Sequence, residues 1–208
     1  VLLFPRRIQR VIPAVWVKMV YWAEKYILGL DYRVVGIENL PPPPYLVAMK
    51  HQSAWETMKI YHLFGDPAVV LKKELMDLPL WGQYAHAVKM IPIDRSKGHR
   101  ALSEMVESAK SVLTDKRPLV VFPQGTRVLV GKKAPYHRGV MKLYEALNIP
   151  MVPVALNAGL FWPRNSFWKK GGVVTVHILP AIASGRPSEE VFKELQETLE
   201  VASEALAQ

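Results

Sequence analysis

Short apolar runs alternate with helical patterns along most of the chain, and this alternation restricts its possible folds more than any other feature. The runs predict strands at residues 32–38, 45–49, 68–71, 90–93, 119–122, 151–156 and 173–179. The other periodic segments predict helices at residues 55–63, 81–88, 100–114, 139–147 and 189–205. Strands that are apolar on both faces occur in sheets covered by helices. The sequence therefore predicts one α/β domain, residues 31–208, with a largely buried mixed sheet flanked by helices.

A basic amphipathic helix is predicted ahead of this domain, at residues 4–30. Apolar residues recur there at helical spacing among several lysines and arginines, and Glu24 is the only acid before Asp31. The same stretch carries tryptophan and tyrosine, which are frequent at lipid interfaces. We therefore interpret residues 1–30 as a membrane-associating segment. A helix that simply packs on the domain core is the alternative.

The composition narrows the classes of partner and of chemistry. The formal charge of +9, from 27 basic and 18 acidic residues, indicates an anionic partner. The aromatic and basic segments at residues 4–30 and 161–170 are rich in large apolar side chains, which favours a lipid surface over nucleic acid. The absence of cysteine excludes disulfides, thiolate metal sites and cysteine nucleophiles. No apolar run reaches the ~18–20 residues of a membrane-spanning helix.

The segment 50–57 (KHQSAWET) joins a predicted strand to a predicted helix and contains the strongest candidates for catalysis. His51 and Glu56 would point apart on a regular helix, so they can meet only if His51 lies in the turn before it. The carboxylate could then orient the imidazole and stabilise its protonated form, leaving the other nitrogen to accept a proton. The alternative is a capping box, Ser53-x-x-Glu56, in which Glu56 is structural.

Polar residues also follow three other predicted strands. Arg95 comes after residues 90–93, the segment Gln-Gly-Thr-Arg at 124–127 comes after residues 119–122, and Lys72 follows a further strand. In open α/β sheets, ligands bind beyond the carboxyl ends of the strands. A histidine base with two guanidinium groups suits a hydroxyl nucleophile carried on a phosphorylated molecule. The glycine of the second segment would let the backbone approach such a ligand closely.

Four segments resemble, in order, the motifs of the glycerolipid acyltransferase family, and most of all those of bacterial 1-acyl-sn-glycerol-3-phosphate acyltransferases. The family pattern H-x-x-x-x-D is similar to residues 51–56, with Glu in place of the usual Asp. The second motif resembles residues 90–95. F-P-E-G-T-R resembles residues 122–127 with Gln124 in place of Glu, and V-P-V-A-L resembles residues 152–156. Each motif alone is weak, but four in order at plausible spacing are strong.

The resemblance implies an acyltransferase in phospholipid biosynthesis. Such an enzyme moves an acyl group from acyl-CoA or an acyl carrier protein to the sn-2 hydroxyl of lysophosphatidic acid, giving phosphatidic acid. The resemblance further implies an anionic membrane surface at the cytoplasmic face of the inner membrane as the location, and no metal or prosthetic group. The implied base and its orienting acid are His51 and Glu56. The implied phosphate-binding residues are Arg95, Gly125, Thr126 and Arg127. The other implied roles are oxyanion stabilisation by Lys72, support by Gln124 and shaping of the acyl pocket by Pro153.

Two alternatives and two departures from the family pattern accompany this prediction. The chain could acylate another lyso-lipid, such as a lyso-ornithine lipid, or it could be a non-catalytic basic lipid-binding protein. Glu56 is one methylene longer than the usual Asp, and Gln124 removes a charge. The other histidines, among them His137, are interpreted as surface or core residues. The chain contains no H-E-x-x-H, Walker A or G-x-S-x-G pattern, which disfavours a zinc protease, a P-loop enzyme and an α/β-hydrolase.

Overall fold

The computed structural model describes residues 11–207, so the first ten residues of the predicted N-terminal segment lie outside the described part. The strands are β1 (Leu30–Val35), β2 (Leu46–Met49), β3 (Ala68–Lys72), β4 (Ile91–Ile93), β5 (Leu119–Val121), β6 (Met151–Leu156) and β7 (Gly172–Ile178). The α-helices are α2 (Val11–Tyr26), α3 (Trp55–Phe64), α4 (Trp81–Ala87), α5 (His99–Ala109), α6 (Ser111–Asp115), α7 (Gly139–Leu147), α8 (Ala158–Phe161) and α9 (Ser188–Ala205). The short 3₁₀ helices are η1 (Ile37–Asn39), η2 (Lys73–Asp77) and η3 (Arg95–Lys97).

The strands form one seven-stranded mixed sheet in the order β1-β7-β6-β2-β5-β3-β4. From β6 to β4 the neighbouring strands are parallel, whereas β7 runs antiparallel to β6 and β1 is parallel to β7. Every predicted strand is present, with ends that move by a few residues. The parallel strands β2, β3, β4 and β5 end at the same edge of the sheet, which is where the predicted site residues follow them.

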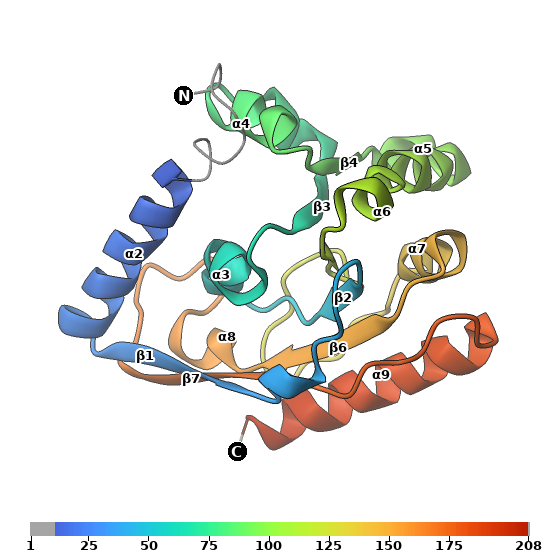
Figure 1. Ribbon diagram of the computed structural model, residues 1–208. Coiled ribbons are helices and arrows are strands. Elements are labelled where there is room, and N and C mark those ends of the chain that lie inside the picture. The colour runs from blue at the N-terminus through green and yellow to red at the C-terminus, as the bar shows by residue number, and fades with distance from the viewer. Residues whose placement is uncertain (1–10, 208) are drawn as a thin grey trace.

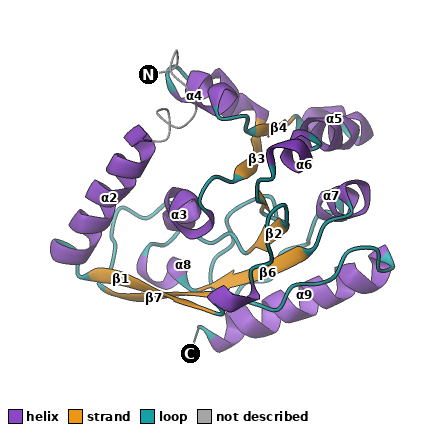
Figure 2. Cartoon of the chain, in the orientation of Figure 1, coloured by secondary structure: helices purple, strands orange, loops and turns teal. Residues whose placement is uncertain are grey.

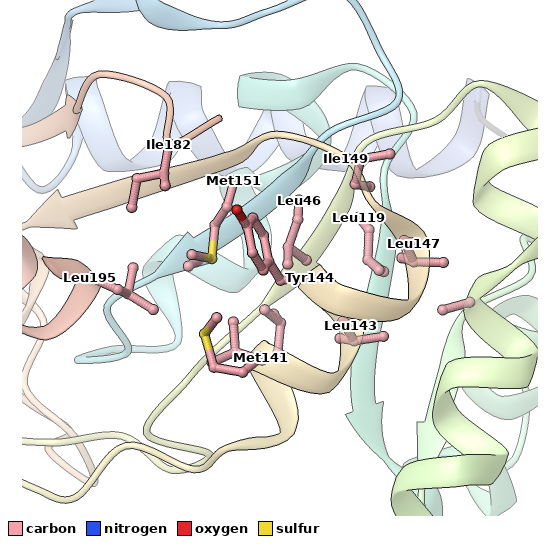
Figure 3. Close-up of a cluster of buried hydrophobic side chains, with 14 of the residues drawn as sticks. Leu46, Leu119, Met141, Leu143, Tyr144, Leu147, Ile149, Met151, Ile182 and Leu195 are labelled. Carbon is pink, nitrogen blue, oxygen red and sulfur yellow. The ribbon is translucent and has the colours of Figure 1, made fainter. Parts of the chain in front are cut away.

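Helices cover both faces of the sheet, as predicted for a largely buried sheet (Figures 1 and 2). The alternation along β2 shows this directly, because Leu46 and Ala48 belong to one buried cluster and Val47 and Met49 to the other. The first cluster packs the sheet against α5, α6, α7 and α9, and the second packs it against α3 and α8. Figure 3 shows the α7 side of the first cluster, where Tyr144 lies among apolar side chains from the strands.

The predicted helix at residues 100–114 is two helices, α5 and α6, which meet at Lys110. At the junction the Lys110 N–H donates to the Glu107 oxygen and the Leu113 N–H donates to the Lys110 oxygen, so the hydrogen bonds span three residues instead of four. The Ser108 and Ser111 hydroxyls donate to backbone oxygens of the preceding turn. Such bonds compete with the helical ladder and bend helices. The apolar periodicity continues across the bend, which is why the pattern predicted one helix.

Helix α2 confirms the predicted N-terminal helix for its described part and packs on β1 and α3. One face buries Val17 and Glu24 against the domain. The opposite face leaves Met19, Trp22 and Tyr26 exposed. The helix therefore contacts the core, as the alternative predicted, and also presents an exposed apolar surface; membrane association of this segment stays a prediction. None of the helices within residues 11–207 is long and apolar enough to cross a membrane.

Candidate active site

The imidazole of His51 and the carboxylate of Glu56 are in direct contact. His51 lies in the turn after β2 and Glu56 in the first turn of α3, as their spacing requires. Nδ1 of His51 lies 2.8 Å from Oε1 of Glu56. The same oxygen accepts hydrogen bonds from the backbone N–H groups of Gln52 and Ser53, both at 2.7 Å. A carboxylate that already accepts two N–H groups also accepts from Nδ1–H, so Nε2 keeps its lone pair.

The capping interpretation of the same segment is also partly correct. The Ser53 hydroxyl accepts a hydrogen bond from the Trp55 N–H at 3.0 Å, and Glu56 accepts from the Ser53 N–H in return. This reciprocal pattern stabilises the start of α3. Glu56 is completely buried, and one of its oxygens contacts both the start of the helix and the imidazole. The contacts that the two alternatives require therefore occur together, and the catalytic role of Glu56 stays a prediction.

The F-P-Q-G-T-R segment holds the imidazole from the other side. The His51 ring stacks on Phe122, with ring centroids 4.1 Å apart and planes at 23°. The Val128 N–H donates to the His51 backbone oxygen at 2.8 Å. The ring is therefore fixed between an acid from α3 and an aromatic ring from the end of β5. Only 14% of the His51 side chain is exposed, and it faces a cavity.

A cavity of about 810 Å³ brings most of the predicted site residues together. Its lining includes His51, Lys72, Arg95, Gly125 and Arg127. Its remaining walls are largely apolar side chains of α3, β3, η2, α4 and α5. The predicted site residues in this lining lie at the carboxyl ends of β2, β3, β4 and β5, as expected for an open α/β sheet. The cavity can therefore accept a ligand with a polar head and an apolar tail.

A side chain at Gly125 would strain the backbone and would require the neighbouring side chains of Arg95 and His137 to move. The φ of +63° at this residue is in the left-handed region, and a Cβ there would lie 2.9 Å from an Arg95 guanidinium nitrogen. The Gly125 oxygen accepts a hydrogen bond from Arg95 at 2.7 Å. This contact holds the Arg95 guanidinium beside the turn that carries Arg127. Among the described residues, no carboxylate lies within ion-pair distance of Arg127, so its charge is available to an anion.

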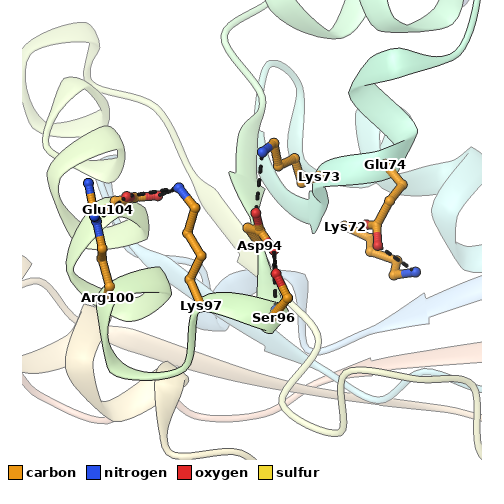
Figure 4. Close-up of polar contacts among 8 residues, drawn as sticks. All are labelled: Lys72, Lys73, Glu74, Asp94, Ser96, Lys97, Arg100 and Glu104. Carbon is orange, nitrogen blue, oxygen red and sulfur yellow. Dashed lines mark hydrogen bonds and ion pairs between the residues drawn. The ribbon is translucent and has the colours of Figure 1, made fainter.

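Lys72 lines the cavity but is also paired with Glu74 at 2.9 Å, and both side chains are more than half exposed (Figure 4). The hydrogen bond from Lys72 holds the pKa of Glu74 below its usual value. Exposed pairs of this kind are weak, so Lys72 can exchange Glu74 for a ligand. In the same view Lys73 contacts Asp94 at 3.2 Å and thereby joins the ends of β3 and β4.

Four predicted site residues do not line the cavity, and one of them is Glu56, which is completely buried beside His51. Thr126 is exposed beside it. Gln124 is almost fully buried, and neither polar atom of its side chain has a hydrogen-bond partner among the described residues. Pro153 is buried within β6, opposite Ala48 of β2. The structure thus places Pro153 in the sheet and gives no support to its predicted role in the acyl pocket.

Sequence reasoning missed His137 at this site. His137 is exposed, as predicted for a surface histidine, but it also lines the cavity. Its ring is so close to Gly125 that a Cβ there would lie 2.9 Å from His137 Cδ2. His137 belongs to no motif and follows an irregular segment, so no pattern in one sequence indicated it. No group of three or more His, Cys, Asp or Glu residues within residues 11–207 could hold a metal ion.

Comparisons with known proteins identify the family of the chain. A family model described as Acyltransferase matches residues 31–157. A 1-acyl-sn-glycerol-3-phosphate acyltransferase of Pseudomonas aeruginosa is 33% identical over 194 residues, which cover 93% of this chain and 76% of that protein. Its Saccharomyces cerevisiae counterpart is 31% identical over 182 residues, which cover 85% of this chain and 60% of that protein.

The fold also has a solved counterpart. The crystal structure of the 1-acyl-sn-glycerophosphate (LPA) acyltransferase PlsC from Thermotoga maritima superposes with a TM-score of 0.76. The superposition covers 98% of this chain and 84% of that one, at 23% sequence identity. At this identity the likeness shows the fold, while the family model and the more similar sequences show the family. The chain belongs to the acyltransferase family.

Proposed function

We propose that this protein transfers a fatty acyl group from a thioester to the sn-2 hydroxyl of 1-acyl-sn-glycerol-3-phosphate, giving phosphatidic acid. The observation that carries the proposal is the His51–Glu56 pair, whose imidazole faces a cavity that is also lined by Arg95 and Arg127 and is otherwise largely apolar. A base, an anion site and an apolar wall are what such an acceptor requires. The names of the two relatives support the same reaction.

The proposed reaction uses His51 as the general base. Nε2 removes the proton of the acceptor hydroxyl while its oxygen attacks the thioester carbonyl carbon. Glu56 stabilises the imidazolium that forms. Lys72 is the candidate to stabilise the negative charge on the former carbonyl oxygen. The tetrahedral intermediate then expels the thiolate, which takes the proton from His51, and the new ester remains on the acceptor.

Recognition of the phosphate is assigned to the turn after β5 together with Arg95. The guanidinium groups of Arg95 and Arg127 can form paired charge-assisted hydrogen bonds to a phosphate monoester. Gly125 gives the ligand close access to the backbone. Thr126, exposed next to this turn, can donate its hydroxyl, and the buried Gln124 of the same turn is assigned a supporting role. The apolar walls of the cavity would hold an acyl chain.

The proposal also names the acyl donor and the membrane surface, and it requires no cofactor. The thioester of acyl-CoA or of an acyl carrier protein already supplies an activated acyl group, so the reaction requires no metal or prosthetic group. The acceptor is a membrane lipid, and the charge of +9 favours an anionic membrane surface, which we place at the cytoplasmic face of the inner membrane. Nucleic acid is not a proposed partner.

A thiol-release assay with acyl-CoA against a panel of lyso-lipids tests the proposal. Lysophosphatidic acid should give the highest kcat/KM, because it alone offers a phosphate monoester to both arginines. Lyso-ornithine lipid and a neutral monoacylglycerol should be poor acceptors. A preference for lyso-ornithine lipid would reassign the substrate. Failure to release thiol with any acceptor, from folded protein on vesicles, would favour a non-catalytic lipid-binding protein.

A further inference from the structure

The segment at residues 162–171, between α8 and β7, projects two aromatic rings into solvent; we call it the aromatic loop. Phe167 is 84% exposed and Trp168 is 80% exposed. They are the two most exposed large apolar side chains among the described residues. Burial of large aromatic side chains releases more free energy than burial of smaller apolar ones. Two adjacent aromatic side chains that are exposed therefore indicate a binding surface. The proposed reaction gives this loop no role.

The loop holds these rings in a formed turn. The Ser166 hydroxyl donates to the Trp168 oxygen at 3.0 Å, and the Lys169 ammonium donates to the Phe167 oxygen at 2.8 Å. The two rings meet edge to face with centroids 5.6 Å apart. The Lys169 ammonium also lies 4.7 Å from the ring centre of Trp162 at the base of the loop. The exposed rings are therefore presented in a fixed arrangement, which lowers the entropy lost when they bind.

Both ends of the loop are attached to parts of the protein already described. The Arg164 guanidinium donates to the Arg127 backbone oxygen at 2.7 Å, in the turn assigned to phosphate recognition. At the other end, the Gly172 N–H donates to the Gly29 oxygen at 2.8 Å, just beyond α2. Figure 1 shows the loop, in orange, between α8 and β7. The loop thus connects the exposed aromatic helix α2 to the candidate phosphate site.

The charge of the loop determines which partner fits it. Arg164, Lys169 and Lys170 flank the two rings in the sequence, and residues 162–171 contain no acid. Aromatic rings accompanied by cations are typical of the interface of an anionic membrane, where the rings sit at headgroup depth and the cations contact lipid phosphates. We propose that the aromatic loop is a membrane anchor separate from α2, which inserts Phe167 and Trp168 into the interface of an anionic bilayer.

This insertion has a geometric consequence for the site. The Arg164 guanidinium donates a hydrogen bond to the Arg127 oxygen and so joins the loop to the turn that carries Arg127. Insertion of the loop would therefore hold this turn beside the layer of lipid phosphates. An acidic acyl carrier protein is the other partner that such a basic surface could attract. The two partners differ in one respect, since only a bilayer brings the rings into contact with acyl chains.

The natural absence of cysteine allows a direct test on the full chain. Phe167→Cys is labelled with a polarity-sensitive fluorophore and mixed with phosphatidylglycerol vesicles whose acyl chains carry bromine. Val201→Cys is the matched control, because Val201 is 67% exposed on α9. We expect a blue shift and quenching for the label at position 167 and neither for the label at position 201. Equal responses at the two positions, or no response at 167 while the protein sediments with the vesicles, would overturn the proposal.

Vesicle affinity provides a second measurement. The double variant Phe167→Ser, Trp168→Ser should raise the dissociation constant for anionic vesicles by about tenfold, while Val201→Ser should leave it unchanged. Lys170→Glu should weaken binding at low salt more than Lys193→Glu, its control on α9. An unchanged affinity of the double variant, or protection of the label at 167 by acyl carrier protein alone, would reject the membrane assignment. Neither readout depends on turnover, so the result is independent of the proposed acyl transfer.

Discussion

One oxygen of Glu56 accepts hydrogen bonds from the imidazole and from two backbone N–H groups. This arrangement explains how glutamate can stand where the family pattern has aspartate. Placed in the first turn of a helix, the longer side chain turns back over the preceding turn and reaches His51. The sequence could predict the pair and its two alternative roles. It could not show that the contact with the imidazole and the contacts with the backbone use the same oxygen of Glu56, because this depends on the path of the turn at residues 50–54.

Replacing Glu56 by glutamine separates the charge from the hydrogen bonds. The amide oxygen can still accept from the backbone, but a neutral group no longer stabilises the imidazolium. We expect Glu56→Gln to lower kcat by about 10²–10⁴-fold. The amide nitrogen would replace a buried oxygen that has no described partner, so unfolding free energy should also fall by about 1–3 kcal/mol. Activity assays below the melting temperature measure the first effect, and denaturant unfolding measures the second. Glu56→Asp is the charge-preserving control in both. Full activity of folded Glu56→Gln would reduce Glu56 to a helix cap.

Arg127 distinguishes recognition of phosphate from general basicity. Each charge-assisted hydrogen bond contributes roughly 1.5–3 kcal/mol, so Arg127→Ala should lower kcat/KM for lysophosphatidic acid by at least about tenfold. Arg127→Lys should recover little, because an ammonium cannot reproduce the planar fork. The loss should shrink with a monoacylglycerol acceptor, which lacks the phosphate. Arg100→Ala, an exposed site on α5, is the control. Equal losses with both acceptors would remove Arg127 from the substrate site.

At the scale of elements, a buried ion pair joins the N-terminal helix to the candidate catalytic helix. Lys59 of α3 lies 2.5 Å from Glu24 of α2, and both side chains are almost completely buried. The rings of Tyr21, Tyr32 and Trp55 lie 5.0–5.5 Å from the lysine ammonium. Glu24 stood out in the sequence as the only acid of a basic helix. Its partner is 35 positions away, so the sequence could not explain it.

This pair predicts a particular pattern of stabilities. Glu24→Gln or Lys59→Met alone would leave an uncompensated buried charge and should cost about 3–5 kcal/mol in urea unfolding. The double variant, which removes both charges, should recover most of that loss. Lys25→Met, in an exposed pair with Asp31, should change stability little. Additive losses in the double variant would show that the two charges do not interact.

The sequence predicted the elements of the fold better than their arrangement. Apolar runs and helical periodicity identified every strand and most helices, because burial on both faces of a sheet leaves a continuous apolar signal. The order of the strands depends on which crossovers pack, and no local pattern encodes that. The bend at Lys110 and the place of His137 beside Gly125 also arise from hydrogen bonds and contacts in space. Motifs identified the candidate site residues, and the cavity that five of them line could not be predicted from the sequence.

At the scale of the whole molecule, exposed apolar residues gather around the cavity. The residues that line the cavity and are also exposed include Trp16 of α2, Leu75 of η2, Trp81 of α4, and Leu78 between η2 and α4. The cavity therefore opens to the surface between these elements. A lipid acceptor could move from a bilayer into such an opening without exposing its acyl chain to water, which would cost about 0.8 kcal/mol per CH₂ group.

This arrangement predicts that apolar residues near the opening affect capture of the lipid but not the chemical step. Met19 and Leu80 are 65% and 79% exposed, and neither lines the cavity. The variant Met19→Ser, Leu80→Ser should raise KM for lysophosphatidic acid presented in vesicles. Its kcat with a short-chain, monodisperse acceptor should equal that of the wild type.

Salt separates the contribution of these apolar residues from the electrostatic attraction, because the Debye length falls from about 30 Å at 0.01 M to about 3 Å at 1 M. The effect of the variant should persist at high salt, whereas attraction by the net charge of +9 should disappear. An equal loss with both acceptors would instead show that these residues support the cavity itself.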